Sequence, residues 1–250
     1  MLTGPIGLHG GGEYVAGDEP FLDALLAAAA RAAEGQTPPH DRIQIVVVPT
    51  AASRGLPDRA AATGVQAFER RAAIAGLPVR VNVARIVDPA SAWDPDLAAE
   101  FITADLIHLP GGDPDLIPAI LAGTAALAAI RHAWERGAVL AGASAGAMAL
   151  AEWTWTPHGG LHGLGFVRGL AVIPHYDEVR RTTWQAAMDK LAPGGIGYLG
   201  LDERTGVLAA PNGTGDRQWT VAGPGAAWWF ARDAREPLVA HDGEMLQIPA

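Results

Sequence analysis

Residues 138–148 read Ala138-Val139-Leu140-Ala141-Gly142-Ala143-Ser144-Ala145-Gly146-Ala147-Met148, an apolar run that enters a serine between two glycines. The residues after Ser144 are small and apolar and favour a helix, so the stretch predicts a strand, a sharp turn and a helix. Such a turn leaves no room for side chains two residues before and after the serine, and Gly142 and Gly146 meet that requirement. We interpret Ser144 as a nucleophile standing on an exposed elbow.

Strand-like and helix-like segments alternate upstream of this turn. Strands are expected over Ile6–His9, Ile43–Pro49, Val79–Val87 and Leu106–Leu109, and helices over about Glu19–Ala33, Pro57–Ala75, Asp94–Ala104 and Thr124–Arg136. Asp18 stands before the first helix as its expected N-cap. The alternation predicts an α/β fold with a mostly parallel sheet flanked by helices on both faces. Residues 1–250 are expected to form one domain.

The pattern changes after the elbow. The apolar run Leu170–Ile173 predicts a strand, and a helix is expected over Glu178–Leu191. From Gly197 onward, short apolar segments are separated by turn residues at 211–213, 222–225 and 242–243. These features predict antiparallel strands toward the C-terminus.

Composition excludes several function classes. The 250 residues carry 18 Lys and Arg against 27 Asp and Glu, a net charge of −9 without a basic run, so nucleic acid is not an expected partner. The chain has no cysteine, which excludes disulfides, thiolate metal sites and a cysteine nucleophile. Neither a cofactor nor a metal is expected. The N-terminus lacks a signal-peptide pattern and the apolar runs are too short or too rich in alanine to cross a bilayer, so we expect a cytoplasmic protein without a membrane partner. A homodimer is compatible with the sequence.

A serine hydroxyl attacks at neutral pH only when a base takes its proton. Eight histidines are available, and His175 is placed best because it directly follows a predicted strand and should emerge at the same sheet edge as Ser144. A carboxylate should orient that histidine. Asp202 and Glu203 both follow the apolar residues 199–201, and strand alternation does not choose between them. The loops at residues 10–13 and 111–113 should lie at the same edge.

Several motifs occur together in order. They are Gly10-Gly11-Gly12-Glu13, Pro49-Thr50-Ala51-Ala52-Ser53, Pro110-Gly111-Gly112-Asp113, Gly142-Ala143-Ser144-Ala145-Gly146-Ala147, His175-Tyr176-Asp177 and Gly200-Leu201-Asp202-Glu203-Arg204-Thr205. In this order they resemble the serine peptidase family of aspartyl dipeptidase (peptidase E) and cyanophycinase. The resemblance implies a class I glutamine amidotransferase-like fold. It also implies Ser144 as nucleophile, His175 as base and Glu203 as the third member of the triad.

The resemblance further implies an oxyanion hole from the N–H groups of Gly112 and Ala145. Family enzymes hydrolyse aspartyl bonds, either in amino-terminal Asp-Xaa dipeptides or in the β-linked Asp-Arg units of cyanophycin. Asp113 is an expected substrate contact, but Pro114 follows it where cyanophycinases usually carry glutamine, so a polar substrate contact is missing. Arg180 and Arg181 resemble the family's arginines in this helix, and either could bind a substrate carboxylate.

Two other functions use the same residues differently. His9-Gly10-Gly11-Gly12 resembles the oxyanion loop of lipases and esterases, and an α/β-hydrolase carboxylesterase would pair Ser144 with His241 and with Asp202 or Asp216. The second alternative is a non-catalytic binding protein that retains the amidotransferase-like shell. The position of each histidine relative to Ser144 separates the peptidase from the esterase.

Overall fold

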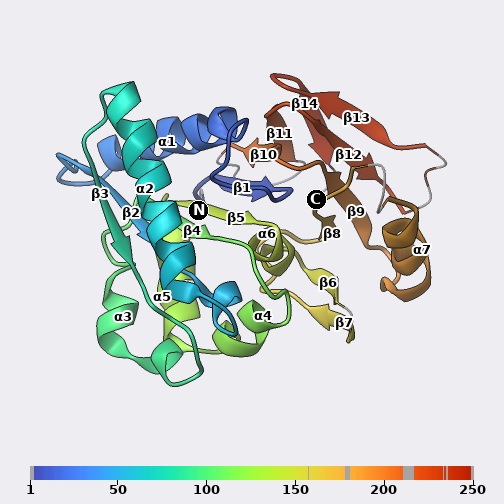
Figure 1. Ribbon diagram of the computed structural model, residues 1–250, viewed down its shortest axis with the longest axis horizontal. Helices are drawn as coiled ribbons and strands as arrows, with labels where there is room; N and C mark the ends of the chain where they lie inside the picture. The colour runs from blue at the N-terminus through green and yellow to red at the C-terminus, as the bar shows by residue number, and fades with distance from the viewer. Residues whose placement is uncertain are drawn as a thin grey trace.

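The computed structural model describes residues 3–156, 158–177, 181–210, 217–232, 234 and 236–248. Its main feature is a sheet with the strand order β14-β11-β10-β1-β5-β4-β2-β3 (Figure 1). The strands of this sheet are β1 (Ile6–His9), β2 (Ile43–Val47), β3 (Val79–Val83), β4 (Leu106–Leu109), β5 (Val139–Ala143), β10 (Gly206–Ala209), β11 (Arg217–Ala222) and β14 (Met245–Ile248).

The neighbouring strands β1, β5, β4, β2 and β3 run parallel to one another. On the other side of β1, the strands β10, β11 and β14 are each antiparallel to their neighbours. β5 lies between β1 and β4, with Gly142 opposite Leu8 on one side and Leu109 on the other. The carboxyl ends of β1, β4 and β5 therefore meet at one edge of the sheet. This edge holds the glycine loop of residues 10–13, the loop of residues 110–113 and the turn at Ser144.

Helices cover both faces of this sheet (Figure 1). On one face lie α1 (Glu19–Glu34) and α2 (Pro57–Ala75), and on the other α3 (Pro95–Ala99), α4 (Leu116–Leu121), α5 (Ala125–Glu135) and α6 (Ala145–Leu150), with the short 3₁₀ turns η1 (Thr50–Ala52) and η2 (Ser91–Trp93). In β2, Ile45 and Val47 pack into the core beneath α1 and α2, whereas Val46 packs into the opposite core. The apolar character of β2 thus follows from its burial on both faces.

A second sheet with the order β13-β12-β9-β8 lies beside the first, at the right of Figure 1 with α7 (Arg181–Leu191). Its strands are β8 (Leu170–Ile173), β9 (Gly197–Leu201), β12 (Ala226–Phe230) and β13 (Leu238–His241). A separate hairpin pairs β6 (Trp153–Thr156) with β7 (Gly159–His162). β8 and β9 are parallel, so their carboxyl ends also reach one edge. His175 lies two residues after the end of β8, and Glu203 lies two residues after the end of β9.

The expected α/β fold and the antiparallel C-terminal strands are confirmed, and four local predictions need correction. The strand expected over Val79–Val87 ends at Val83, and the helix expected over Asp94–Ala104 ends at Ala99. The strand before His175 belongs to the second sheet rather than to the sheet of Ser144. Asp18 precedes α1 but makes no side-chain cap. The turn expected at residues 211–213 lies outside the described residues.

None of the described helices combines the length and the apolar character that a membrane span needs.

Candidate active site

Ser144 stands between β5 and α6 in a backbone conformation that few serines adopt, with φ 49° and ψ −114°. Its neighbours make this conformation accessible. A methyl group on Gly142 would lie 2.4 Å from the Gly146 carbonyl carbon, and one on Gly146 would lie 1.9 Å from the Leu109 carbonyl oxygen. Only glycine fits at both positions, as the elbow pattern requires. The Ser144 side chain makes no cap to α6, so its hydroxyl faces the site.

The structure brings three of the sequence-predicted residues into one chain of contacts. Ser144 Oγ lies 3.0 Å from His175 Nε2, and His175 Nδ1 lies 2.8 Å from Glu203 Oε1. Both distances are within hydrogen-bond reach. An anionic Glu203 can only accept, so it selects the ring tautomer with the proton on Nδ1 and leaves the Nε2 lone pair toward the serine hydroxyl. The His175 and Glu203 side chains are 29% and 45% exposed, so the chain of contacts is open to solvent on one side.

Backbone contacts to the glycine loop hold His175. Its N–H donates to the Gly10 carbonyl at 2.8 Å, and its own φ is 51°. A methyl group on Gly11 would lie 2.3 Å from His175 Cε1, so the imidazole rests directly on the Gly11 backbone. The absence of a side chain at residue 11 therefore makes room for the ring.

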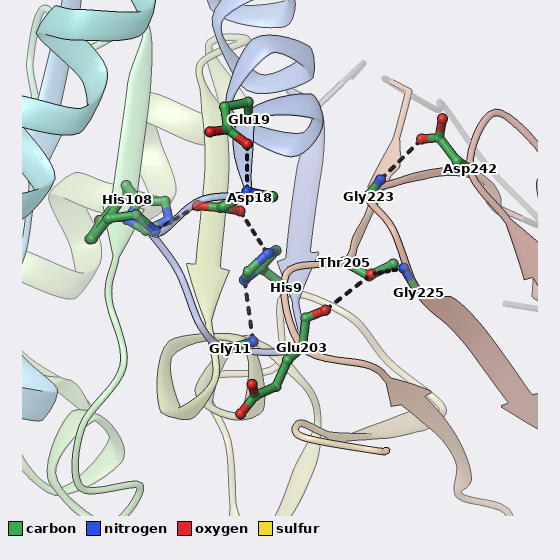
Figure 2. Close-up of polar contacts among 12 residues, drawn as sticks. His9, Gly11, Asp18, Glu19, His108, Glu203, Thr205, Gly223, Gly225 and Asp242 are labelled. Carbon is green, nitrogen blue, oxygen red and sulfur yellow. Dashed lines mark hydrogen bonds and ion pairs between the residues drawn. The ribbon is translucent and has the colours of Figure 1, made fainter. Parts of the chain in front are cut away.

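Glu203 lies in the turn that leaves the second sheet and enters β10 of the first. The Arg204 N–H donates to the Gly11 carbonyl at 2.7 Å, and the Gly10 N–H donates to the Thr205 carbonyl at 2.9 Å. The buried Thr205 hydroxyl donates to the Glu203 carbonyl and accepts from the Gly225 N–H (Figure 2). These contacts fix both sides of Glu203 to the end of β1 and to the start of β12.

Asp202, the other carboxylate that the sequence offered, has a different partner. Its Oδ2 accepts the Ala226 N–H at 2.9 Å, and burial raises the pKa of this carboxyl. The structure thus separates the two neighbouring carboxylates, with Glu203 on the His175 ring and Asp202 on the backbone of β12.

The loop at residues 110–113 lies against Ser144. A methyl group on Gly111 would lie 3.1 Å from Ser144 Cβ, and the Gly111 N–H donates to Glu13 Oε1 at 2.7 Å. The Asp113 N–H donates to the Ala51 carbonyl at 2.7 Å. Between these two anchored amides, the Gly112 N–H has no acceptor among the described residues, and neither does the N–H of Ala145 at the start of α6.

The residues expected to contact the substrate, Asp113 and Arg181, have different partners in the structure. Asp113 Oδ2 pairs with Arg54 Nη1 at 2.8 Å, and Asp113 Oδ1 accepts the Asp115 N–H. The Arg181 guanidinium lies 4.1 Å from the centre of the Trp228 ring and 5.0 Å from that of Tyr176. Arg181 Nε is buried and has no hydrogen-bond partner in the described part of the chain. Arg180 lies outside the described residues.

Two other histidines have partners away from Ser144, and one of them, His241, is the base in the esterase alternative. His241 lies at the exposed end of β13, where its backbone N–H donates to Glu244. His158 Nδ1 contacts Asp115. Asp216, one of the two acids in the esterase alternative, lies outside the described residues. Within the described residues, no group of three or more His, Asp or Glu side chains is arranged to hold a metal ion.

The sequence patterns gave two side chains near the site other roles, His9 as part of an esterase-like loop and Asp18 as a helix cap. His9 closes β1 behind the glycine loop, and its ring lies between Asp18 and the Gly11 N–H (Figure 2). The only sequence signal for the contact between them was polarity, because His9 and Asp18 are polar residues at positions where the fold is fully buried.

Comparison with known families places this geometry in context. Residues 30–210 match Peptidase family S51, which is more than half of the chain. The chain belongs to peptidase family S51. The family expected from the order of the motifs is therefore confirmed, and membership makes this chain a peptidase.

Solved structures agree with the S51 assignment. A peptidase from an acI-B1 actinobacterium is 25% identical, with a TM-score of 0.80 over 99% of this chain and 98% of that one. A candidate peptidase E from Listeria monocytogenes EGD-e shares the fold at 13% identity, with a TM-score of 0.57 over 89% of this chain and 100% of that one. No curated protein matches the sequence.

Proposed function

We propose that this S51 peptidase is a serine peptidase that cleaves aspartyl peptide bonds through a Ser144–His175–Glu203 triad and an acyl-enzyme. The observation that carries the proposal is the chain of contacts from Ser144 Oγ to His175 Nε2 at 3.0 Å and from His175 Nδ1 to Glu203 Oε1 at 2.8 Å. Nucleophile, base and orienting carboxylate are recognised by this mutual geometry. The esterase alternative lacks such support, because His241 lies on exposed β13 with contacts to its own turn.

In the proposed first step, Ser144 Oγ attacks the carbonyl carbon of the substrate while its proton passes to His175 Nε2. The developing oxyanion would accept the N–H groups of Gly112 and Ala145, which have no acceptor among the described residues. Glu203 accepts the Nδ1–H of the imidazolium and stabilises its charge. His175 then protonates the leaving amine, the C–N bond breaks, and an ester joins the substrate acyl group to Ser144.

In the second step, water attacks this ester. His175 Nε2 takes a proton from the water, a second tetrahedral species forms over the same two N–H groups, and the C–Oγ bond breaks. The proton returns to Ser144 Oγ, which restores the starting state. Neither step requires a group beyond the side chains and amides named here.

Specificity for an acidic residue requires a cation near the acyl site. Arg181 is our candidate among the described residues, because its Nη2 lies 3.5 Å from the carbonyl oxygen of Tyr176, the residue after His175, and a guanidinium can bind a carboxylate. The Trp228 and Tyr176 rings hold its guanidinium in place, which reduces the entropy lost on binding. Asp113 is our candidate for binding the substrate ammonium group. That group would compete with Arg54 for the Asp113 carboxylate.

A panel of substrates tests this function. We expect purified protein to cleave amino-terminal Asp-Xaa or β-aspartyl peptides in preference to neutral dipeptides, cyanophycin and short-chain esters. Ser144→Ala should remove the activity except for a small residual rate, whereas His241→Ala should leave it unchanged. Cleavage of esters alone, with sensitivity to His241→Ala, would contradict the proposal and favour the esterase.

Arg181→Ala provides a second test of substrate class. If the guanidinium binds the aspartyl carboxylate, kcat/KM for an acidic peptide should fall by about 10- to 100-fold, equivalent to roughly 1.4–2.8 kcal/mol. Neutral peptides should be affected much less. Equal losses in kcat/KM for acidic and neutral peptides would mean that Arg181 supports the fold through its contact with Trp228 and does not bind the substrate.

A further inference from the structure

His9 is a buried histidine with two complementary polar contacts. Its Nδ1 accepts the Gly11 N–H at 3.2 Å, and its Nε2 lies 2.9 Å from Asp18 Oδ1 (Figure 2). The His9 and Asp18 side chains are each 1% exposed. Because Nδ1 accepts from an amide, the ring proton resides on Nε2, which lies beside the carboxylate but without the alignment of a hydrogen bond. The ring also stacks on Phe21 with 4.9 Å between centroids, so its plane is fixed.

Asp18 ties both ends of the glycine loop together. Its Oδ1 faces His9 at the start of the loop, and its Oδ2 accepts the Tyr14 N–H at 2.7 Å at the end. A carboxylate in this position explains why Asp18 does not cap α1. The loop between these two anchors is Gly10-Gly11-Gly12-Glu13, in which Gly11 and Gly12 have φ values of 102° and 68°. Glycines have many accessible conformations, so such a loop needs anchors to hold one of them.

This loop touches His175 and the turn that carries Glu203. Gly10 accepts the His175 N–H, Gly11 accepts the Arg204 N–H next to Glu203, and the His175 ring rests on Gly11. The Gly10–Gly11 peptide unit therefore has His9 Nδ1 at its N–H and the His175 N–H at its carbonyl oxygen. A rotation of this peptide would break the backbone contact of His175 and move the surface beneath its imidazole together.

We propose that His9 is a positioning residue for the triad, acting through the Gly11 N–H and packed beside Asp18. The proposal rests on the function proposed above, because it assumes that His175 activates Ser144. His9 does not touch the reacting atoms. Its role is to hold the Gly11 peptide so that the His175 ring stays within reach of Ser144 Oγ. Displacements of about 1 Å in such a constellation can cost on the order of 100-fold in rate.

Two conservative variants separate the two contacts of His9. In His9→Asn, the amide oxygen can take the place of Nδ1 and accept the Gly11 N–H, but nothing reaches Asp18. In His9→Gln, the amide nitrogen can take the place of Nε2 and donate to Asp18, but the Gly11 N–H loses its acceptor. His9→Leu removes both contacts at similar size.

The measurement is the second-order rate at which a fluorophosphonate labels Ser144 in the full chain, alongside thermal unfolding of each variant. In labelling, Ser144 Oγ bonds to phosphorus, fluoride leaves and the serine proton passes to His175, so the rate reports the triad without any assumption about the peptide substrate. We expect His9→Asn to be labelled within about threefold of wild type but to melt at lower temperature. We expect His9→Gln and His9→Leu to be labelled about 10- to 100-fold more slowly.

His40 offers a matched control. His40 Nδ1 lies 2.9 Å from the fully buried Asp105, which precedes β4 at the edge of the sheet opposite to Ser144. His40→Asn should lower the melting temperature as loss of a histidine–aspartate pair does, and should leave the labelling rate unchanged. This control separates loss of stability from loss of positioning.

Equal slowing in His9→Asn and His9→Gln would overturn the proposal, and so would a wild-type labelling rate in all the His9 variants. If His9→Leu does not fold, the comparison of Asn with Gln still decides. Failure of the aspartyl substrate assignment would appear separately, as normal labelling of the wild-type chain with no cleavage of acidic peptides. A wild-type chain that the probe does not label would contradict the nucleophile role of Ser144, and the role of His9 with it.

Discussion

The backbone at Ser144 is strained, and its neighbours hold it in place. Conformations of this kind cost roughly 1–3 kcal/mol and persist only where surrounding contacts enforce them. The Ser144 N–H donates to the His9 carbonyl at 2.9 Å and the Ser144 carbonyl accepts the Met148 N–H at 3.0 Å, so both sides of the residue are fixed. The strain directs the hydroxyl out of the sheet edge and toward His175.

Gly146→Ala should destabilise the protein strongly. The added methyl group would lie 1.9 Å from the Leu109 carbonyl oxygen, which is backbone of β4 and cannot turn aside as a flexible side chain could. We expect a loss of about 3 kcal/mol or more in the free energy of unfolding, measured by urea denaturation. Gly194→Ala is the control, because a methyl group there meets nothing within 4 Å. Similar stability of the two variants would show that the elbow can relax around a side chain.

Glu203→Gln should reduce kcat while leaving KM nearly unchanged. The amide keeps the size of the side chain but lacks the charge that stabilises the His175 imidazolium. Because Glu203 is 45% exposed, we expect a loss of about 10- to 1,000-fold, less than for a buried triad carboxylate. Asp202→Asn serves as the comparison, since its oxygen can still accept the Ala226 N–H. An equal loss in Asp202→Asn would mean that the wrong carboxylate has been assigned.

At residue scale, sequence patterns succeeded where a position needs one specific residue type, and failed where partners come from distant segments. The Gly-x-Ser-x-Gly spacing predicted the turn at Ser144 because only glycine fits at Gly142 and Gly146. Asp18 looked like a helix cap from its neighbours alone, but its partners are His9 and the Tyr14 N–H. The choice between Asp202 and Glu203 depended on a turn that contains Arg204 at φ 57°, which strand alternation does not describe.

Among the elements, the loop at residues 110–113 is anchored before any substrate arrives. The Gly111 N–H is bound to Glu13, and the Asp113 N–H to Ala51, so the Gly112 N–H between them has a fixed direction. Preorganised donors of this kind stabilise an oxyanion without reorganisation during the reaction. Glu13 thus links the glycine loop after β1 to the loop after β4.

Glu13→Ala should therefore lower kcat, because the Gly111 N–H loses its acceptor and the loop gains freedom. We expect a decrease of about 10- to 100-fold in steady-state assays with an acidic peptide. Glu13→Gln should recover most of the rate, since an amide oxygen can accept the same N–H. If Glu13→Gln is as slow as Glu13→Ala, the carboxylate acts through its charge and the anchoring role is wrong.

Element boundaries were harder to predict than element types because burial continues beyond regular structure. The strand expected over Val79–Val87 ends at Val83, yet Ala84 and Ile86 remain fully buried. The Ile86 carbonyl bonds to the Thr50 hydroxyl instead of to a neighbouring strand. Apolar residues in a buried loop and in a strand look alike in sequence. The short helix α4 and the hairpin β6–β7 span too few residues for a clear periodic pattern.

In the whole molecule, the proposed triad is assembled from both sheets. β5 of the first sheet delivers Ser144, β8 of the second delivers His175, and Glu203 lies where the chain crosses from β9 to β10. The sequence predicted the strands before His175 and Glu203 but not that they form a separate sheet. Strand partners are chosen by non-local packing, which a single sequence does not display. Gly10 and Gly11 join the two parts through backbone contacts.

The stability of the whole molecule should depend on pH through His108, a buried histidine in contact with Tyr14. Burial lowers the pKa of His108 from 6.5 to about 3, with a smaller contribution from His9, and the Tyr14 hydroxyl lies 2.7 Å from His108 Nδ1. The folded protein therefore binds fewer protons than the unfolded chain between these two values. The contribution of His108 to the free energy of unfolding is fully present above pH 6.5 and is lost as the pH falls from about 6.5 to about 3.

Between pH 7 and pH 5, His108 should lower the free energy of unfolding by about 2 kcal/mol, since the unfolded side chain becomes protonated and the folded one does not. His108→Asn removes the titrating ring, and its amide oxygen can still accept the Tyr14 hydroxyl proton. We expect this variant to be less stable at pH 7 because it leaves a cavity, but to lose about 2 kcal/mol less than wild type on acidification. Urea denaturation at the two pH values measures both slopes. Parallel slopes would mean that His108 binds a proton in the folded protein as readily as in the unfolded chain, and would contradict the lowered pKa.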